Sequence, residues 1–455
     1  MAGCAADAVA GRSDSETVAH WVAGPAPVQA PAAIRERATD LLLDTLGVGI
    51  AAGALPAAGI AYEMAAAQFG AGEPPATLAF DGRRVSPAGA AWALATRIDN
   101  LDAHDGYQPA KGHAGAALVP ALLAAAEAWR PDADGEEALA ALVAGYEIAC
   151  RAATALHAGA GDYHSSGAWN ALGAAALVGR LRRLDADTIA AALGIAEYHA
   201  PRAPMMREID APSMLHDSSG WGALAGVTAV DLAVRGFAAS AAELPAVEGP
   251  WSDLGRTWLV PEQYVKPHPV CFWAQPAVTA ALRLRREHSV DPAAIRRVRL
   301  STFHEATRLF AGVPADTQTA QYALAFPVAA ALAHGRLDPP QISGPGLADP
   351  ATCELVGRIA VEEDPALSAR FPAARLAVIT LELADGRVLA SPPTEPRGTP
   401  ADPLDRAAIG AKFHAYADPV LGDERAHAIA ASIHDLAAGR SSLGNLLERV
   451  RPPVA

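Results

Sequence analysis

Five side chains able to transfer protons or bind a metal ion lie close together in the segment RIDNLDAHDGYQPAKGH, residues 97–113. They are Asp99, Asp102, His104, Asp105 and His113. The residues that follow, AGAALVPALLAAAEAW, carry no charge before Glu127 and indicate a buried apolar helix. Three interpretations fit this pattern: a metal site, an acid/base site, or a solvated loop that is merely polar.

A metal site would rest on the adjacent His104 and Asp105, because metal-dependent phosphohydrolases use a His-Asp pair of this kind. Such sites need further histidines and aspartates from neighbouring helices. Gly106 and Pro109 follow the pair and place it in a loop rather than inside a helix. The metal interpretation is therefore the weaker one, and no metal is expected.

An acid/base site would depend on His113, at the start of the apolar helix. Burial and a nearby carboxylate such as that of Asp102 can tune the pKa of a histidine and hold its tautomer and orientation. A histidine that only caps the helix is the alternative.

Two further segments carry candidate groups. In GAGDYHSSGAWNALGAAAL, His164 precedes Ser165 and Ser166, either of which could cap the next helix, so His164 would lie near a helix end suited to an anion. In YVKPHPVCFWAQPAV, Lys266 precedes Pro267 and Pro269 and could anchor a substrate carboxylate in a cleft. A capping loop and a solvated linker are the respective alternatives. Cys271 has no basic neighbour in the sequence and is expected to be a buried thiol.

The elements that must position these groups are mostly helical. Hydrophobic residues make up 51% of the 455 residues but aromatics only 5%, so alanine dominates and favours helices. Apolar spacing is helical from about residue 15 to 260. IRRVRLSTF then alternates as a half-buried strand, and RLAVITLELADGRVLASPP predicts a hairpin with a two-residue turn at Asp385-Gly386. Helical spacing returns after the proline-rich stretch 391–403.

This organisation predicts a mainly α fold with two domains. A large all-helical domain would be formed by both chain ends, residues 1–262 and 404–455. A smaller α+β lid domain would comprise residues 263–403.

Composition argues against several classes of protein. A formal net charge of −14 disfavours nucleic-acid binding. No basic region precedes an apolar run at the N-terminus, and the longest uncharged windows contain Pro56 and several glycines, so neither a secretory signal nor a membrane span is expected. The scattered cysteines predict reduced thiols in a cytoplasmic protein; they are Cys4, Cys150, Cys271 and Cys353.

Several segments, taken in order, resemble the MmgE/PrpD family, which includes 2-methylcitrate dehydratase, cis-aconitate decarboxylase and iminodisuccinate epimerase. They are LLLDTLGVGIAAG, NLDAHDGYQPAKGHAGAALVPALLA, YHSSGAWNALGAAA, MLHDSSGWGALAGVTAVDLAVRGF, YVKPHPVCFWAQPAV and AQYALAFPVAAALAHG. The resemblance implies the two domains described above, a homodimer, and an active site in the cleft between the domains. It implies neither a metal nor an organic cofactor.

The same resemblance implies roles for individual residues. Asp102, His113 and His164 would be catalytic, and Lys266 would bind substrate. His216, Tyr107 and His104 are also assigned to substrate binding.

Several positions depart from the family pattern. His216, or alternatively Ser213, stands where many members carry a lysine. Gly106 replaces a hydroxyl-bearing residue, and Phe326 or Pro327 replaces a lid tyrosine. Phe272 and Gln275 replace a basic residue and a histidine. These changes remove positive charge, so a smaller or less charged acid than a tricarboxylate is expected.

The sequence therefore predicts a cofactor-independent lyase that abstracts a proton α to a carboxylate or carbonyl of a small organic acid, followed by dehydration through β-elimination. Epimerisation, isomerisation or decarboxylation on the same scaffold is the alternative. A metal-dependent hydrolase and a binding protein without catalysis remain as rivals from other classes.

Overall fold

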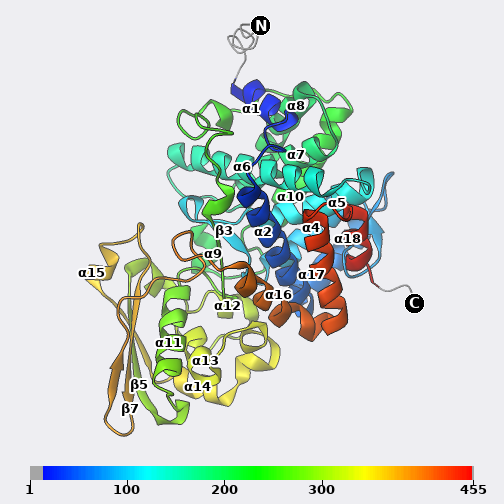
Figure 1. Cartoon of the computed structure of the whole chain (residues 1–455). Coiled ribbons are helices and arrows are strands. Elements are labelled where there is room, and N and C mark those ends of the chain that lie inside the picture. Colours follow the sequence, from blue (N-terminus) through cyan, green and yellow to red (C-terminus); the bar gives the residue numbers. More distant parts are fainter. Residues whose placement is uncertain (1–13, 453–455) are drawn as a thin grey trace.

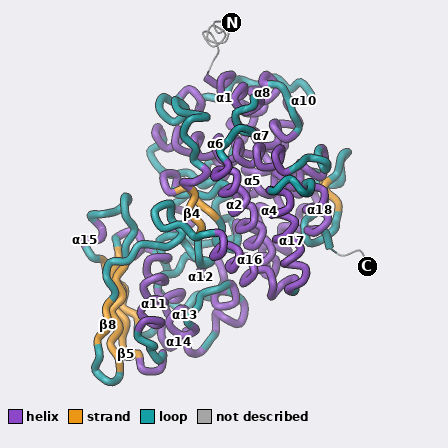
Figure 2. The backbone as a smooth tube through the Cα atoms, in the orientation of Figure 1, coloured by secondary structure: helices purple, strands orange, loops and turns teal. Residues whose placement is uncertain are grey.

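The computed structural model describes residues 14–452 and is mainly α-helical (Figure 1, Figure 2). Its first part is a series of helices joined by short loops. They are α1 (Asp14–Ala23), α2 (Ala32–Ala51), α3 (Pro56–Gln68), α4 (Pro87–Asp99), α5 (Gly115–Trp129), α6 (Gly135–Gly159), α7 (Gly167–Leu181), α8 (Ala186–His199), α9 (Met206–Asp210) and α10 (Ser219–Val234). The first cysteine, Cys4, lies outside the described residues.

The helices of this part pack closely because small residues lie where they meet. A Cβ atom at Gly173 of α7 would lie 2.8 Å from the carbonyl oxygen of Gly145 in α6, and one at Gly226 of α10 would lie 2.6 Å from the carbonyl oxygen of Ala171 in α7. Real Cβ atoms essentially never approach backbone so closely, so these crossings exclude any larger side chain. The alanine and glycine content thus sets the close spacing of the bundle.

The second part carries a four-stranded sheet at the end of the molecule opposite α1 and α8 (Figure 1). Its order is β6-β5-β7-β8, with β6 parallel to β5 and the other pairs antiparallel. The elements are β5 (Ile295–Thr302), β6 (Ile359–Glu363), β7 (Ala377–Leu383) and β8 (Val388–Ala390), with helices α11 (Gln275–Glu287), α12 (Thr317–Gln321), α13 (Ala325–His334), α14 (Pro350–Val356) and α15 (Pro365–Ser368). Helix α11 packs against β7, and α13 packs against β6.

The strand prediction for this region is confirmed. In β5, Val298, Leu300 and Thr302 are buried, whereas the alternate residues face outward. The hairpin between β7 and β8 also forms, but its predicted two-residue turn is wrong. Leu383 bonds to Arg387 across a three-residue loop, and within Asp385-Gly386 only Gly386 has a positive φ, of 86°. The aspartate instead accepts the backbone N–H of Arg387.

The last helices return to the first part of the chain, as the sequence predicts. Helix α16 (Arg406–Leu421) packs along α2, followed by α17 (Asp423–Ala437) and α18 (Leu443–Val450) (Figure 1). The Nζ atom of Lys412 in α16 lies 2.7 Å from Asp44 Oδ1 in α2 and 2.7 Å from the carbonyl oxygen of Ala103. The C-terminal region therefore holds the loop between Asp102 and His104.

Two small ribbons complete the described structure. Strands β1 (Ala76–Thr77) and β2 (Arg84–Val85) form one, and β3 (Asp105–Tyr107) pairs antiparallel with β4 (Gln263–Val265) to form the other. The second ribbon brings the polar loop of residues 97–113 beside the residues that precede Lys266. The division of the chain at residues 262 and 404 stays a prediction.

One helix, α6, is long and apolar enough to cross a membrane by length and composition, and 94% of its apolar window is buried inside the fold. The bent pair α2–α3 passes the same test only when it is counted as a single span. Such burial is the pattern of a core helix.

The buried pair of Lys412 and Asp44 gives a test of this architecture. Lys412→Met leaves the carboxylate of Asp44 buried without its cation, so we expect unfolding free energy to fall by about 3–5 kcal/mol in urea denaturation. The control is Arg235→Ala, which removes an exposed pair with Asp231 and should cost about 0.5 kcal/mol or less. Equal stability of the two variants would contradict the role given to the C-terminal helices.

Candidate active site

His113 is held just before α5 by bonds to its backbone. Its N–H donates to Ser166 Oγ at 2.8 Å, and its carbonyl oxygen accepts from Asn170 Nδ2 at 2.8 Å. Asp105 fixes the helix itself, because its carboxylate accepts the Gly115 N–H at 3.1 Å and the Tyr146 hydroxyl at 2.7 Å. Burial raises the pKa of Asp105 to about 6. The adjacent His104 and Asp105 therefore do not act as a pair. The carboxylate of Asp105 has a structural role, because its partners are Gly115 and Tyr146.

The tautomer of His113 follows from its partner. Its Nδ1 lies against the carbonyl oxygen of Asp105, which can only accept, so Nδ1 carries the proton and donates. Burial lowers the pKa of His113 well below its usual range. The neutral ring therefore presents an unprotonated Nε2, which is the form of a general base.

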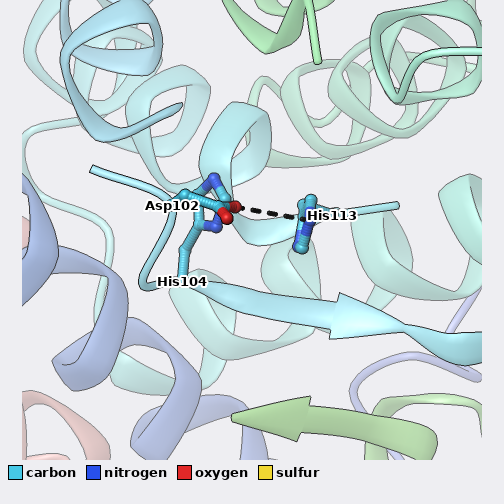
Figure 3. A group of neighbouring side chains, drawn as sticks. All are labelled: Asp102, His104 and His113. Atoms are coloured by element: carbon cyan, nitrogen blue, oxygen red, sulfur yellow. Dashed lines mark ion pairs between the residues drawn. The ribbon is translucent and has the colours of Figure 1, made fainter. Parts of the chain in front are cut away.

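Nε2 of His113 faces two carboxylates without bonding to either. Asp102 Oδ1 lies 4.0 Å away and Asp217 Oδ2 lies 3.7 Å away (Figure 3 shows the Asp102 contact). Both distances exceed a hydrogen bond. The expectation that Asp102 orients His113 needs correction, since the Asp105 carbonyl does this.

Asp102 is instead the partner of Lys266. The ammonium of Lys266 contacts Asp102 Oδ1 and also donates to the carbonyl oxygen of Asp102 at 3.2 Å. The side chains are only 1% and 3% exposed. Lys266 is therefore already neutralised inside the protein, with one of its three N–H donors left for a substrate.

Glu208 and Asp217 form a second carboxyl pair on the same wall. They share a hydrogen bond, and the Tyr322 hydroxyl donates to Glu208 while the Ser166 hydroxyl donates to Asp217 Oδ2 at 2.6 Å. Burial raises the pKa of Glu208 to about 8, and burial together with Glu208 raises that of Asp217 well above its usual range. Two buried carboxyls this close hold a proton between them at neutral pH.

These groups line one small cavity, the inner pocket, of about 50 Å³. It opens toward a wider depression of about 560 Å³, the outer hollow. The ionisable residues of the inner pocket are Asp102, Lys111, His113, Glu208, Asp217, Tyr264, Lys266, Cys271, Tyr322 and Arg375. The prediction for Cys271 is confirmed: it is buried, and burial raises the pKa of its thiol to about 12.

The three other residues predicted to bind substrate, His104, His216 and Tyr107, do not line this pocket. The His104 ring stacks on His113 with centroids 4.4 Å apart, and its Nε2 donates to Asp99 at 3.2 Å. His216 is buried behind the pocket, with Nδ1 3.4 Å from Glu208 Oε1. Tyr107 is buried, with its hydroxyl 3.4 Å from Thr154 Oγ1.

His164 is not brought to this group. It precedes α7 half-buried beside His157, with ring centroids 6.3 Å apart, and its N–H donates to His157 Nε2 at 3.1 Å. It is absent from the lining of both the inner pocket and the outer hollow. Ser166 occupies the N-cap position but makes no capping bond, because its hydroxyl serves His113 and Asp217.

The carboxyl pair and the two pocket tyrosines, Tyr264 and Tyr322, were not among the residues predicted from the sequence. Asp217 follows His216 in the segment already singled out, whereas nothing in the local sequence marks Glu208. A lid tyrosine was sought at Phe326 or Pro327, and Tyr322, four residues before Phe326, lines the pocket. A Cβ at Gly106 would collide with the ring of Tyr264, so the glycine makes room for a pocket hydroxyl from another strand.

Two models of known protein families match most of this chain. The family model for the MmgE/PrpD N-terminal domain matches residues 16–254, and the model for the C-terminal domain matches residues 268–437. The chain belongs to the MmgE/PrpD family. It is also similar to a cis-aconitate decarboxylase-like protein of Aspergillus oryzae, with 30% identity over 187 residues. That alignment spans 39% of this chain and 38% of the relative.

A metal ion is the main chemical alternative at this MmgE/PrpD site. Ligand atoms of Asp102, His104 and His113 all lie within 4.8 Å of one another. The Lys266 ammonium, however, already contacts the Asp102 carboxylate, and its charge repels a second cation there. The donor set therefore fits a divalent ion poorly while Lys266 is present.

This repulsion predicts the outcome of metal analysis. Purified protein should hold no stoichiometric zinc, iron or manganese, and EDTA should leave activity unchanged. Stoichiometric metal that is lost in His104→Ala, together with loss of activity on chelation, would contradict the assignment and restore the hydrolase alternative.

Proposed function

We propose that this protein is a cofactor-independent lyase that removes a proton α to a carboxylate or carbonyl of a small organic acid. One observation carries the proposal: His113, whose Nδ1 is bonded to the Asp105 carbonyl oxygen, lines a buried pocket with its Nε2 3.7 Å from Oδ2 of Asp217 in the carboxyl pair. A base and an acid on one wall are what a β-elimination requires. Membership of the MmgE/PrpD family supports an enzyme of the dehydratase or decarboxylase kind.

In the first step, Nε2 of His113 takes the α-proton and the ring becomes imidazolium. The electron pair of the broken C–H bond moves to the substrate, which becomes an enolate. The remaining N–H of Lys266 can donate to an enolate or carboxylate oxygen, while Asp102 stabilises the imidazolium from 4.0 Å.

In the second step, the electron pair forms the double bond and the β-hydroxyl group leaves. The Glu208–Asp217 pair gives its proton to the leaving oxygen, so that water is released. The product is an unsaturated acid, and the proton on His113 then restores the carboxyl pair. Dehydration therefore needs no group beyond those of the inner pocket.

The geometry suggests a proton donor that the sequence does not. The sequence predicts His113 and His164 as the acid and the base, in an order that it does not assign. We place the proton donor on the Glu208–Asp217 pair, because Asp217 Oδ2 lies 3.7 Å from His113 Nε2 whereas His164 contacts His157 outside the pocket. Catalysis by His164 stays a prediction, and the variants below test it.

Decarboxylation is the second candidate, and the name of the Aspergillus relative favours it. The same site would then protonate a carbanion left by loss of CO₂. Epimerisation would return the proton to the opposite face of the same enolate. Elimination and epimerisation are expected to exchange the α-proton of the substrate with solvent, whereas decarboxylation takes up deuterium only in its product. Deuterium in recovered substrate therefore separates the first two reactions from decarboxylation.

Removing the base tests the proposal directly. We expect His113→Ala to lower turnover, and the α-deuteration of a panel of small hydroxy acids in D₂O, by about a hundredfold or more, as for loss of a general base. Circular dichroism would establish that the variant is folded. His164→Ala is the matched control and should retain activity within a few-fold. A hundredfold loss in His164→Ala would return the acid role to that residue, and an active His113→Ala would end the proposal.

The pKa shifts predict a bell-shaped pH profile of kcat/KM. Activity should fall at low pH, where His113 becomes protonated, but only well below pH 6.5 because burial lowers the pKa of His113. It should also fall at alkaline pH, beginning near pH 8, because burial raises the pKa of Glu208 to about 8 and burial together with Glu208 raises the pKa of Asp217 well above its usual range. Glu208→Gln cannot titrate, so the alkaline fall should shift or vanish. An alkaline limb unchanged in that variant would exclude the pair as the acid.

A further inference from the structure

The neck between the inner pocket and the outer hollow has a distinctive set of side chains. Four residues line both cavities: Gln108, Lys111, Phe272 and Arg375. Three of them carry N–H donors and none is acidic. The inner wall, by contrast, carries Asp102, Glu208 and Asp217. A substrate that passes the neck therefore meets positive charge first and carboxyl groups beyond it.

Arg375 is a buried cation with few partners. Its side chain lies just before β7 and is only 4% exposed. Its guanidinium lies over the rings of Phe272 and Phe371, at 5.5 and 5.6 Å from their centroids. Its Nη1 donates weakly to the carbonyl oxygen of Pro372 at 3.3 Å, and its Nε is buried without a hydrogen-bond partner in the described part of the chain.

Two other buried arginines of the described residues have stronger partners than Arg375, although the Nε of Arg151 also lacks a hydrogen-bond partner. Arg151 pairs with Glu147 and Asp253 and donates to the carbonyl oxygen of Thr257. Arg97 donates to two carbonyl oxygens near the end of α2. Arg375 makes no ion pair with any carboxylate of residues 14–452. A guanidinium has five N–H donors in a planar fork that matches a carboxylate, and leaving these donors buried and unpaired is costly.

We propose that Arg375, with Lys111 and Gln108, binds a carboxylate group remote from the reacting carbon, so that the natural substrates are small dicarboxylates. This rests on the proposed function in that the reacting carbon is placed beside His113. The remote carboxylate lies at the neck, and the carbon chain crosses the wall formed by Tyr264 and Phe272, whose stacked rings are 4.0 Å apart.

The charges on either side of the neck support this orientation of the substrate. Lys266 is neutralised by Asp102, so the inner pocket offers one N–H but little net positive charge. Lys111 is half-buried with its Nζ 3.1 Å from the centroid of the Tyr163 ring, which holds the ammonium at the neck. Glu262 and Glu395 also line the outer hollow, but neither lines the inner pocket. The small inner volume of about 50 Å³ restricts the chain between the two ends to a few carbons.

Binding of unreactive probes tests this without any turnover. Calorimetry of the full chain with succinate and glutarate, and with the monocarboxylate butyrate, should show that a dicarboxylate binds about tenfold or more tightly than butyrate. Arg375→Gln should remove this preference by weakening the dicarboxylate while changing butyrate less than twofold. Lys111→Gln should weaken the dicarboxylate by a smaller factor.

The controls separate binding from folding. Arg283→Gln removes an arginine that lines a different depression and donates to Thr394, and it should leave both affinities unchanged. If Arg375→Gln does not fold, Arg375→Lys keeps the charge but cannot bind a carboxylate with two parallel N–H groups, and it should lose most of the preference. A wild-type protein that binds neither dicarboxylate, or a folded Arg375 variant with the wild-type preference, would overturn the proposal and leave Arg375 as a packing residue.

The same measurements distinguish this proposal from the proposed reaction. His113→Ala should bind the dicarboxylate within about twofold of wild type, since His113 removes a proton and does not hold the remote carboxylate. Arginine-dependent binding without α-proton exchange in any acid would overturn only the reaction. Exchange that does not depend on Arg375 would overturn only the dicarboxylate site.

Discussion

The buried ion pair of Asp102 and Lys266 is the contact on which the geometry of the inner pocket depends. It joins positions 164 residues apart, and neither charge could be buried alone without a cost of several kcal/mol. Each side chain therefore fixes the loop that carries the other. The β3–β4 ribbon keeps these loops in register, and Lys412 holds the intervening Ala103 carbonyl from the opposite end of the chain. Residues from three distant parts of the sequence thus meet around Asp102 and Ala103.

The acids and bases of the pocket acquire their protonation states from burial rather than from residue type. His113 is kept neutral because a charged ring would be poorly solvated there, and Glu208 and Asp217 keep a proton because two buried carboxylates repel each other. A base whose pKa is lowered and an acid whose pKa is raised can then work at the same pH.

The charged groups of the pocket are distributed unequally between its neck and its inner wall. Positive groups at the neck, Lys111 and Arg375, precede the carboxyl groups of the inner wall. Phe272, which the sequence presents as a loss of positive charge, is covered by the guanidinium of Arg375. Positive charge is therefore restored at the pocket by a residue about a hundred positions away in the sequence. The residue at position 272, taken alone, would therefore lead to an underestimate of the negative charge of the substrate.

The sequence by itself determined the mainly helical fold, the alternating strand β5, the hairpin at Gly386, the return of the C-terminal helices and the family. Each of these follows from short-range periodicity or from ordered motifs along the chain. It also selected His113, Asp102 and Lys266, because a polar cluster before an apolar helix and a lysine followed by two nearby prolines are local signals. Only the tertiary structure decided which groups touch: that Asp102 serves Lys266, that a backbone carbonyl orients His113, and that Glu208, Tyr322 and Arg375 reach the pocket while His164 does not. Those contacts arise from helix packing and burial over long sequence separations, and burial also sets the pKa values, so no local pattern could reveal them.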